Sequence, residues 1–549
     1  MTPSPDLRSP IYPLLLLLSW ALLTLPTLGL APLFDYDETV YAQTALDMMH
    51  HGQWIVPTAN GMQFFEKPPF TYYLMDLSFK LFGDNAFAAR LPSALFTLLT
   101  AWVLFAGGSR LKDRRFGLTA AAIFLSMLEV ALLAHAAILD SVLNFFIATA
   151  LVSYALWIKG GRPRLAYAMA AAMGAAVSVK GPVGVVVPLL VIGLDRLWAG
   201  DVRGCVARFP WLPCLGLFLL TATPWYLLIL IQNGPAFLYD FIVVQNIGRA
   251  LHPMQGHGGG WTYYLVVFLV SCLPWVGWLP AYFRRAFARS GTGDETDRSL
   301  LRFSVVWVLA VIVLFSFAQT KLPHYISSIY PGLALGLATL VYAATTDGGV
   351  SGRLIRGLSL AVLLPVGLAV TALPWIYPLL TKLVHNPRAM AIVAQPIAPS
   401  PLIAVAGVAV LAALAAAVYG RHRTLPGLAV RFVVLGLVLQ TALLVGVGGF
   451  TGRLMQTPTM DIAARIRQLP PDVPVYSFEL NAPSVSFYAG RNYRIVSDAA
   501  TLAATLKPPY ALVLRSESAA RLAGIPLPSP AFDAGGFLLY LAPAPAARP

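Results

Sequence analysis

Closely spaced carboxylates follow the first long apolar run of the chain. Asp35, Asp37 and Glu38 come directly after that run, and farther on Glu66 stands beside Lys67, just before two prolines. A carboxylate kept near the hydrocarbon boundary of a membrane costs free energy, which makes it a functional candidate by default. Helix capping is the alternative for Asp37, because Asp is also a preferred N-cap residue.

Isolated charges also stand at the ends of later apolar runs. Asp140 lies in AHAAILDSVLNFF with no basic residue nearby, and its alternative role is an interface residue whose side chain reaches toward water. Lys180, Arg249 and Lys321 lie in segments that the charge pattern places outside, where basic residues are uncommon. Basic groups retained there indicate an anionic ligand, and phosphate is the simplest one.

One histidine raises the question of a metal ion. His257 lies in a Gly-rich segment and could meet Glu66 across a cavity, where the two side chains would hold a divalent metal. A metal site normally shows three or four ligands, and two candidates from distant segments fall short of that number. A solvated histidine is therefore the alternative, and both interpretations stay open.

The elements that must position these residues are membrane-spanning helices. Of 549 residues, 58% are hydrophobic and 11% are charged, whereas soluble domains carry about 25% charged residues. A spanning helix needs roughly 20 apolar residues, and such runs recur almost to Phe450. A soluble protein is excluded, and we interpret the first run, 11–30, as a retained helix and not a signal peptide.

The hydropathy pattern predicts thirteen spans. They lie near 11–30, 87–108, 116–134, 138–158, 165–179, 181–198, 210–231, 262–283, 301–318, 326–345, 356–375, 401–419 and 430–449. With the N-terminus inside, the cytoplasmic loops hold 21 Lys and Arg residues and the opposite loops hold 7. This bias predicts the orientation and explains most of the net charge of +14 without a nucleic-acid partner.

Two regions stand outside the spans. The first outer loop, 31–86, carries a predicted helix over 38–50 with one apolar side, as expected for a helix in the interface plane. After the transmembrane domain, 1–450, residues 451–549 alternate between predicted helices and strands, which favours a small α/β domain. We expect helices at 459–468 and 501–506, and strands at 473–478, 510–514 and 536–541.

Several of these stretches resemble one known family. DETVYAQTALDMMHHGQWIVP, FFEKPPFTYY and LFGDNAFAARLPSAL resemble the GT-C membrane glycosyltransferases, within them the lipid A 4-amino-4-deoxy-L-arabinose transferases and the related dolichyl-phosphate-mannose protein mannosyltransferases. VKGPVGVVVP and KLPHYISSIYP continue the likeness, which covers most of residues 10–335. The resemblance implies an all-α polytopic GT-C fold of about thirteen transmembrane helices, with interfacial helices in the first outer loop and a small C-terminal α/β periplasmic domain.

The resemblance also implies roles for individual residues. Asp37 would be the essential carboxylate of the first outer loop, with Glu66 and Asp140 as further acidic residues of the site. The residues that would face the carrier phosphate are Lys67, Arg249 and Tyr325, to which the charge pattern adds Lys321. One departure is Val40, where the aminoarabinose transferases usually have a basic residue, so the particular sugar and acceptor do not follow.

These observations predict an inner-membrane glycosyltransferase with its active site on the periplasmic side. It would move a sugar from an undecaprenyl-phosphate-type carrier to a lipid or glycan acceptor such as lipid A, by one-step inverting displacement. Asp37 would act as a general base toward a hydroxyl, or would orient a phosphate acceptor. The alternatives are a protein O-mannosyltransferase, another envelope-glycan transferase, or a flippase, which would place its polar groups near the bilayer midplane.

Overall fold

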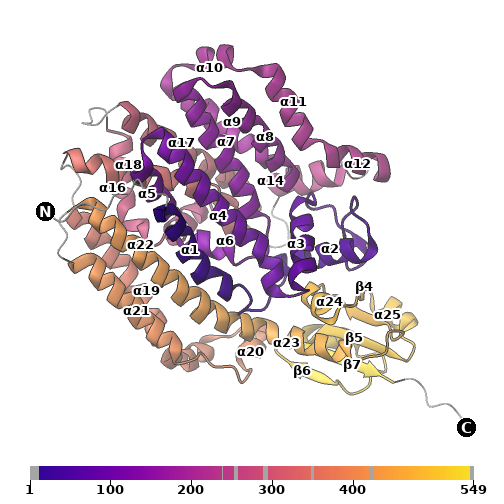
Figure 1. The fold of residues 1–549 in the computed structure, drawn as a ribbon. Helices are drawn as coiled ribbons and strands as arrows, with labels where there is room; N and C mark the ends of the chain where they lie inside the picture. Colours follow the sequence, from indigo (N-terminus) through magenta and orange to yellow (C-terminus); the bar gives the residue numbers. More distant parts are fainter. Residues whose placement is uncertain are drawn as a thin grey trace, which may run out of the picture.

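The computed structural model describes residues 11–235, 237, 239–252, 258–288, 295–347, 352–420 and 424–543. Most of the chain forms a bundle of helices, and a small mixed sheet follows near the C-terminus (Figure 1). The first outer loop, with helices α2 and α3, lies between the bundle and this sheet.

The helices of the bundle follow one another with short connections. The first half contains α1 (Ile11–Thr24), α4 (Ala86–Leu111), α5 (Arg114–Leu125), α6 (Leu128–Ala134), α7 (Asp140–Gly160), α8 (Pro163–Lys180), α9 (Val183–Ala199), α10 (Val202–Arg208), α11 (Trp211–Ala222) and α12 (Pro224–Asn233). The second half contains η2 (Tyr239–Gly248), α14 (Arg249–Leu251), α15 (Tyr263–Ser271), η3 (Trp275–Trp278), α16 (Leu279–Ala286), α17 (Glu295–Phe317), η4 (Pro323–Ile326), α18 (Ile329–Asp347), α19 (Gly352–Leu380), α20 (Pro387–Val393), α21 (Leu402–Tyr419), α22 (Leu425–Thr441), η6 (Ala442–Gly448) and α23 (Gly449–Arg467).

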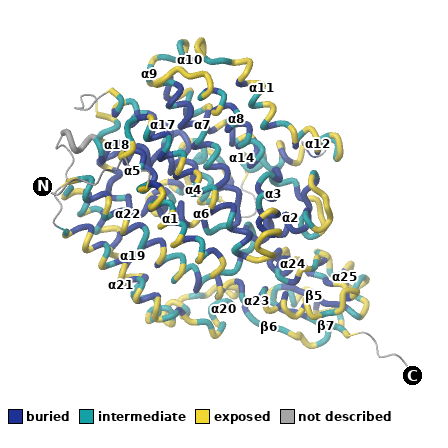
Figure 2. The backbone as a smooth tube through the Cα atoms, viewed as in Figure 1, coloured by how far each residue is buried: buried dark blue, intermediate teal, exposed yellow. Residues whose placement is uncertain are grey.

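Apolar helices of spanning length confirm a multi-pass membrane protein. Within the described ranges, six helices are long and apolar enough to cross a membrane, or nine if each of three bent helix pairs is one span. Large apolar side chains also face outward, and Leu212 and Ile231 are 82% and 83% exposed. Figure 2 shows such exposed stretches along α11, α19 and α21, as expected of a surface solvated by lipid. The exact count of thirteen spans stays a prediction.

Two of the predicted spans are not straight helices. The segment predicted at 116–134 bends by 69° between α5 and α6, and the segment predicted at 262–283 bends by 108° after α15. Hydropathy alone gives the position of such segments but not their path, because a bend leaves the apolar composition unchanged. The structure therefore has apolar helices in both predicted spans and adds a bend within each.

The two bends face each other inside the bundle and satisfy each other's backbone groups. The Leu128 N–H donates to the Leu273 carbonyl across the two breaks at 2.9 Å. The Gln440 side-chain amide donates to the carbonyls of Leu125 and Met127 at 2.9 and 2.8 Å. Non-helical backbone is tolerated at membrane depth only where protein provides such partners.

The C-terminal sheet has five strands. In spatial order these are β4 (Arg494–Val496), β3 (Val475–Phe478), β5 (Tyr510–Arg515), β7 (Phe537–Ala542) and β6 (Phe532–Ala534). Strands β4, β3 and β5 are parallel to one another, and β7 pairs antiparallel with β5 on one side and with β6 on the other. Helices α24 (Pro483–Ala489) and α25 (Ala499–Thr505) accompany them. The strands predicted at 473–478, 510–514 and 536–541 and the helix at 501–506 are confirmed. The residues predicted as a helix at 459–468 are helical, but they form the last part of the longer helix α23.

The helix predicted over 38–50 is confirmed as α2 (Asp37–His51). Residues 38–48 are all buried, because α2 packs against α3 (Phe70–Phe82), α24 and the short hairpin of β1 (Thr58–Ala59) and β2 (Met62–Gln63). The first outer loop is therefore held between the bundle and the C-terminal sheet.

Candidate functional site

Two of the three carboxylates at the start of α2 are engaged in structural contacts. Glu38 is buried and accepts hydrogen bonds from the Arg90 guanidinium at 2.8 Å and from the Ala137 N–H at 2.7 Å. Asp35 accepts from the backbone N–H of Ser484 at 2.9 Å and from the hydroxyl of the same residue. Neither carboxylate is left to act on a substrate.

Asp37 differs from both of its neighbours. Its half-buried carboxylate makes no hydrogen bond or ion pair with any residue that the structure describes. It is the first residue of α2, the N-cap position belongs to Tyr36, and no side chain caps this end. The capping alternative is therefore wrong. A negative charge is favourable at a helix N-terminus, and the Asp37 carboxylate remains available for a ligand.

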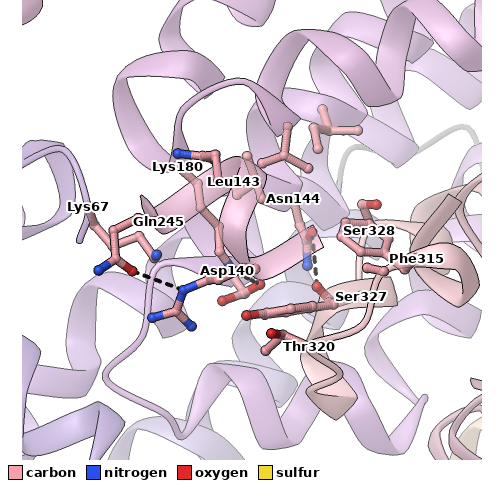
Figure 3. Close-up of a pocket in the computed structure, with 16 residues that line it drawn as sticks. Lys67, Asp140, Leu143, Asn144, Lys180, Gln245, Phe315, Thr320, Ser327 and Ser328 are labelled. Atoms are coloured by element: carbon pink, nitrogen blue, oxygen red, sulfur yellow. Dashed lines mark hydrogen bonds and ion pairs between the residues drawn. The ribbon is translucent and has the colours of Figure 1, made fainter. Parts of the chain in front are cut away.

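A cavity of about 150 Å³ is lined by four of the predicted site residues, Lys67, Asp140, Arg249 and Tyr325, whereas Asp37 and Glu66 are not among its lining residues (Figure 3). Its charged lining residues come from elements far apart in the sequence. They are Lys67 from the loop before α3, Asp140 at the start of α7, Lys180 at the end of α8 and Arg249 at the start of α14. Tyr325 of η4 lines the same cavity. The structure thus brings together segments that the charge pattern predicts on one side of the membrane.

Two ion pairs organise the charges of this cavity. The Lys180 ammonium lies 2.7 Å from a carboxylate oxygen of Asp140, and the Arg249 guanidinium lies 2.9 Å from the Glu66 carboxylate. Asp140 is only 2% exposed, so the alternative of a side chain reaching toward water is wrong. Burying one member of such a pair without its partner would cost several kcal/mol. Asp140 and Glu66 therefore hold Lys180 and Arg249 in place.

Lys67 is the cation of this cavity that has no carboxylate partner among the described residues. Its ammonium donates to the backbone carbonyl of Glu66 at 3.0 Å. Burial and the neighbouring Arg249 charge lower the pKa of the half-buried Lys67 to about 8. Both causes disfavour the protonated amine, and an anion bound beside it would relieve them. The site is thus arranged to accept one more negative charge.

Several polar residues that line the cavity or contact its lining were not predicted from the sequence. The Asn144 side chain accepts from the Ser327 hydroxyl at 3.3 Å, and Gln245 accepts from Arg249 at 3.0 Å (Figure 3). His324 lies 3.9 Å from the Asp140 carboxylate, and burial lowers the pKa of its imidazole. Helical spacing could have found two of them, since Asn144 and Gln245 each lie four residues from a predicted site residue.

Lys321 does not line the cavity. Its ammonium donates to the Ser316 carbonyl at 2.8 Å and also to the Ala318 carbonyl, both at the C-terminal end of α17. Basic side chains commonly satisfy the last carbonyls of a helix in this way. This contact explains why a lysine stands at that position without any phosphate ligand.

The metal prediction falls partly outside the described residues. His257 lies outside them, and the Glu66 carboxylate contacts Arg249. Within the parts of the chain that the structure describes, no group of three or more His, Cys, Asp or Glu side chains is arranged to hold a metal ion. A metal bound by Glu66 and His257 stays a prediction.

Comparison with known proteins gives one family match and several similar proteins. A family model described as dolichyl-phosphate-mannose-protein mannosyltransferase matches residues 66–227. The undecaprenyl phosphate-alpha-4-amino-4-deoxy-L-arabinose arabinosyl transferase 2 of Sodalis glossinidius (strain morsitans) is 32% identical over 333 residues, which are 60% of this chain and 59% of that protein. The corresponding transferase of Serratia proteamaculans (strain 568) is 30% identical, over 60% and 58%. The match thus spans less than two thirds of these relatives.

A solved structure extends the likeness in fold to nearly the whole chain. The crystal structure of ArnT from Cupriavidus metallidurans bound to undecaprenyl phosphate superposes with a TM-score of 0.79 and 23% identity, covering 98% of this chain and 99% of that one. The helical bundle with its C-terminal sheet is therefore a GT-C fold. In sequence and in fold the chain thus resembles the undecaprenyl-phosphate aminoarabinose transferases.

Proposed function

We propose that this protein is an inner-membrane glycosyltransferase that moves 4-amino-4-deoxy-L-arabinose from undecaprenyl phosphate to a lipid A-type acceptor. The relatives named for this reaction support the donor, and the positive-inside bias supports an active site on the periplasmic face. Residues 1–450 would carry the catalytic cavity and 451–549 a periplasmic domain.

The charge balance of the cavity is the observation that carries this proposal. Lys67, Lys180 and Arg249 supply three positive charges, and Asp140 and Glu66 supply two negative ones. The donor is a phosphodiester with one negative charge, which matches the remaining positive charge. The departing carrier is a phosphate monoester, which bears about −1.5 to −2 at neutral pH. The cavity therefore stabilises the phosphate more strongly as it leaves, as catalysis requires.

The transfer itself would proceed in one step. An acceptor oxygen attacks the anomeric carbon from the face opposite the phosphate, and the sugar–phosphate bond breaks with its electron pair on the phosphate oxygen. Asp37 receives the proton if the acceptor is a hydroxyl, or orients the acceptor if it is already ionised. Lys67 and Arg249 bind the phosphate, with Tyr325 beside them. We assign no donor contact to Lys321.

A protein O-mannosyltransferase is the second candidate. The match of residues 66–227 to the mannosyltransferase family model favours it. Val40 also stands where the aminoarabinose transferases usually have a basic residue, which weakens the inference to one particular sugar. A flippase has less support, since the cavity lies at the ends of its helices and not at their middle.

A donor panel in liposomes tests the proposal. The purified protein is given undecaprenyl phosphate carrying radiolabelled aminoarabinose, mannose or glucose, together with lipid A or an acceptor protein. The proposal predicts label on lipid A from the aminoarabinose donor. Label on protein from the mannose donor would favour the second candidate, and an intact donor that crosses the bilayer would make the protein a flippase.

A further inference from the structure

We propose that the C-terminal domain positions the catalytic carboxylate, and that Ser484 of α24 is the residue through which it acts. This inference rests on the proposed function, because it assigns Asp37 the role of the acting group. No other part of the proposal gives the C-terminal domain a role in the reaction.

The segment that leads into α2, residues 33–36, is held by α24 and by Asn481, which precedes α24. The Leu33 N–H donates to the Tyr488 hydroxyl at 2.8 Å. Asn481 donates from its side-chain amide to the Tyr36 hydroxyl at 3.2 Å. Between these two contacts lies the bond from the Ser484 N–H to Asp35. With the further bond from the Ser484 hydroxyl to Asp35, four hydrogen bonds therefore fix residues 33–36 from the C-terminal side.

Asp35 is the centre of this arrangement. Its carboxylate accepts two hydrogen bonds from Ser484 and one from the Thr39 hydroxyl at 2.5 Å. Partial burial raises the pKa of the Asp35 carboxyl, and the hydrogen bonds from Ser484 oppose that rise. A carboxylate in such a place is costly when its donors are removed. The conformation of this segment is therefore stable only while α24 is docked.

Asp37 lies between two anchors on the same stretch of chain. On its N-terminal side Asp35 is tied to Ser484, and on its C-terminal side Glu38 is tied to Arg90 of the bundle. Releasing one anchor lets the start of α2 move. A displacement of about 1 Å at a reacting group can cost up to about 100-fold in rate.

The donor cavity stands apart from these contacts. Its charged residues Lys67, Asp140, Lys180 and Arg249 contact one another, Glu66, Gln245 and His324, and none of the hydrogen bonds or ion pairs described for them involves residues 481–488. Loss of the Ser484 contact should therefore slow transfer without weakening donor binding.

The test compares Ser484→Ala with Ser484→Thr, which keeps the hydroxyl, and with Asn492→Ala. Asn492 accepts from Gln43 of α2 at 3.3 Å, so its variant loses a contact of the same interface but not one to residues 33–36. Measurements are kcat and KM for the donor, undecaprenyl-phosphate binding and the thermal unfolding midpoint of the full-length protein in detergent.

A positioning role predicts that Ser484→Ala lowers kcat by about 10-fold or more, with unchanged undecaprenyl-phosphate binding. Ser484→Thr should recover most of the rate, and Asn492→Ala should keep it. Asp35→Asn, which retains the shape of the side chain, should lower kcat in the same way.

The inference would be overturned if Ser484→Ala and Asn492→Ala lowered kcat, carrier binding and the thermal unfolding midpoint to the same extent. Ser484 would then be one docking contact among several. Wild-type kcat in Asp35→Asn and Ser484→Ala would do the same. If the wild-type protein itself transfers no sugar, the proposed function fails, which is a separate result.

Discussion

The protonation of Lys67 should set the alkaline limit of the reaction. Its pKa is lowered to about 8, and the protonated amine is the form that attracts phosphate. The protonated fraction is therefore half at pH 8 and about one tenth at pH 9. Because kcat/KM reports the free enzyme, kcat/KM for the donor should fall about 5-fold between pH 8 and pH 9. The donor phosphodiester and Arg249 do not titrate in this range.

Lys67→Arg isolates this effect, because a guanidinium stays protonated throughout the range. We measure donor kcat/KM from pH 6 to 10 at saturating acceptor for both proteins, with Lys80→Arg as the control. Lys80 is an exposed lysine of the same loop that pairs with Asp76. The variant at Lys67 should lose the decline above pH 8, whatever its absolute rate. An unchanged alkaline decline in Lys67→Arg, or no decline in the wild type, would refute this reasoning.

Three further predictions concern neighbouring contacts. Arg249→Ala should weaken undecaprenyl-phosphate binding about 10-fold or more by equilibrium titration, as expected for the loss of a charge-assisted hydrogen bond. Lys321→Ala should change this binding less than about 2-fold, because that ammonium lies outside the cavity and donates to the carbonyls of Ser316 and Ala318. Asp140→Asn should lower kcat without weakening carrier binding, since Lys180 loses its partner but keeps its charge. Glu38→Ala should lower the free energy of unfolding by about 3–5 kcal/mol, because it leaves the Arg90 charge buried and unpaired, and a thermal midpoint equal to the wild type would contradict that.

Local patterns in the sequence predict the elements well. Helix α2 begins and ends within one residue of its predicted range 38–50, because the helical spacing of apolar side chains is a property of neighbouring residues. Strands β3, β5 and β7 of the C-terminal sheet follow from short apolar runs for the same reason. The bends at α5–α6 and after α15 could not be predicted in this way, since they depend on distant backbone and side-chain partners such as Gln440.

In the candidate site too, the sequence predicts the local features and distant contacts decide the rest. The charge pattern marks Lys180, Arg249 and Lys321 alike, but only the fold separates the two cavity residues from the one that caps α17. Asp35 and Asp37 look equivalent in the sequence. They differ because Ser484, 449 residues away from Asp35, satisfies one carboxylate and leaves the other unengaged. Non-local contacts decide which of several similar residues remains available for chemistry.

The central claim is that Asp37 acts in sugar transfer, and one comparison tests it most directly. Asp37→Asn and Asp84→Asn are measured side by side with a radiolabelled undecaprenyl-phosphate aminoarabinose donor and lipid A, because Asp84 is an exposed carboxylate of the same loop. The account predicts that Asp37→Asn binds undecaprenyl phosphate normally but transfers sugar about 100-fold or more slowly, while Asp84→Asn keeps the wild-type rate. Transfer by Asp37→Asn at the wild-type rate would contradict it.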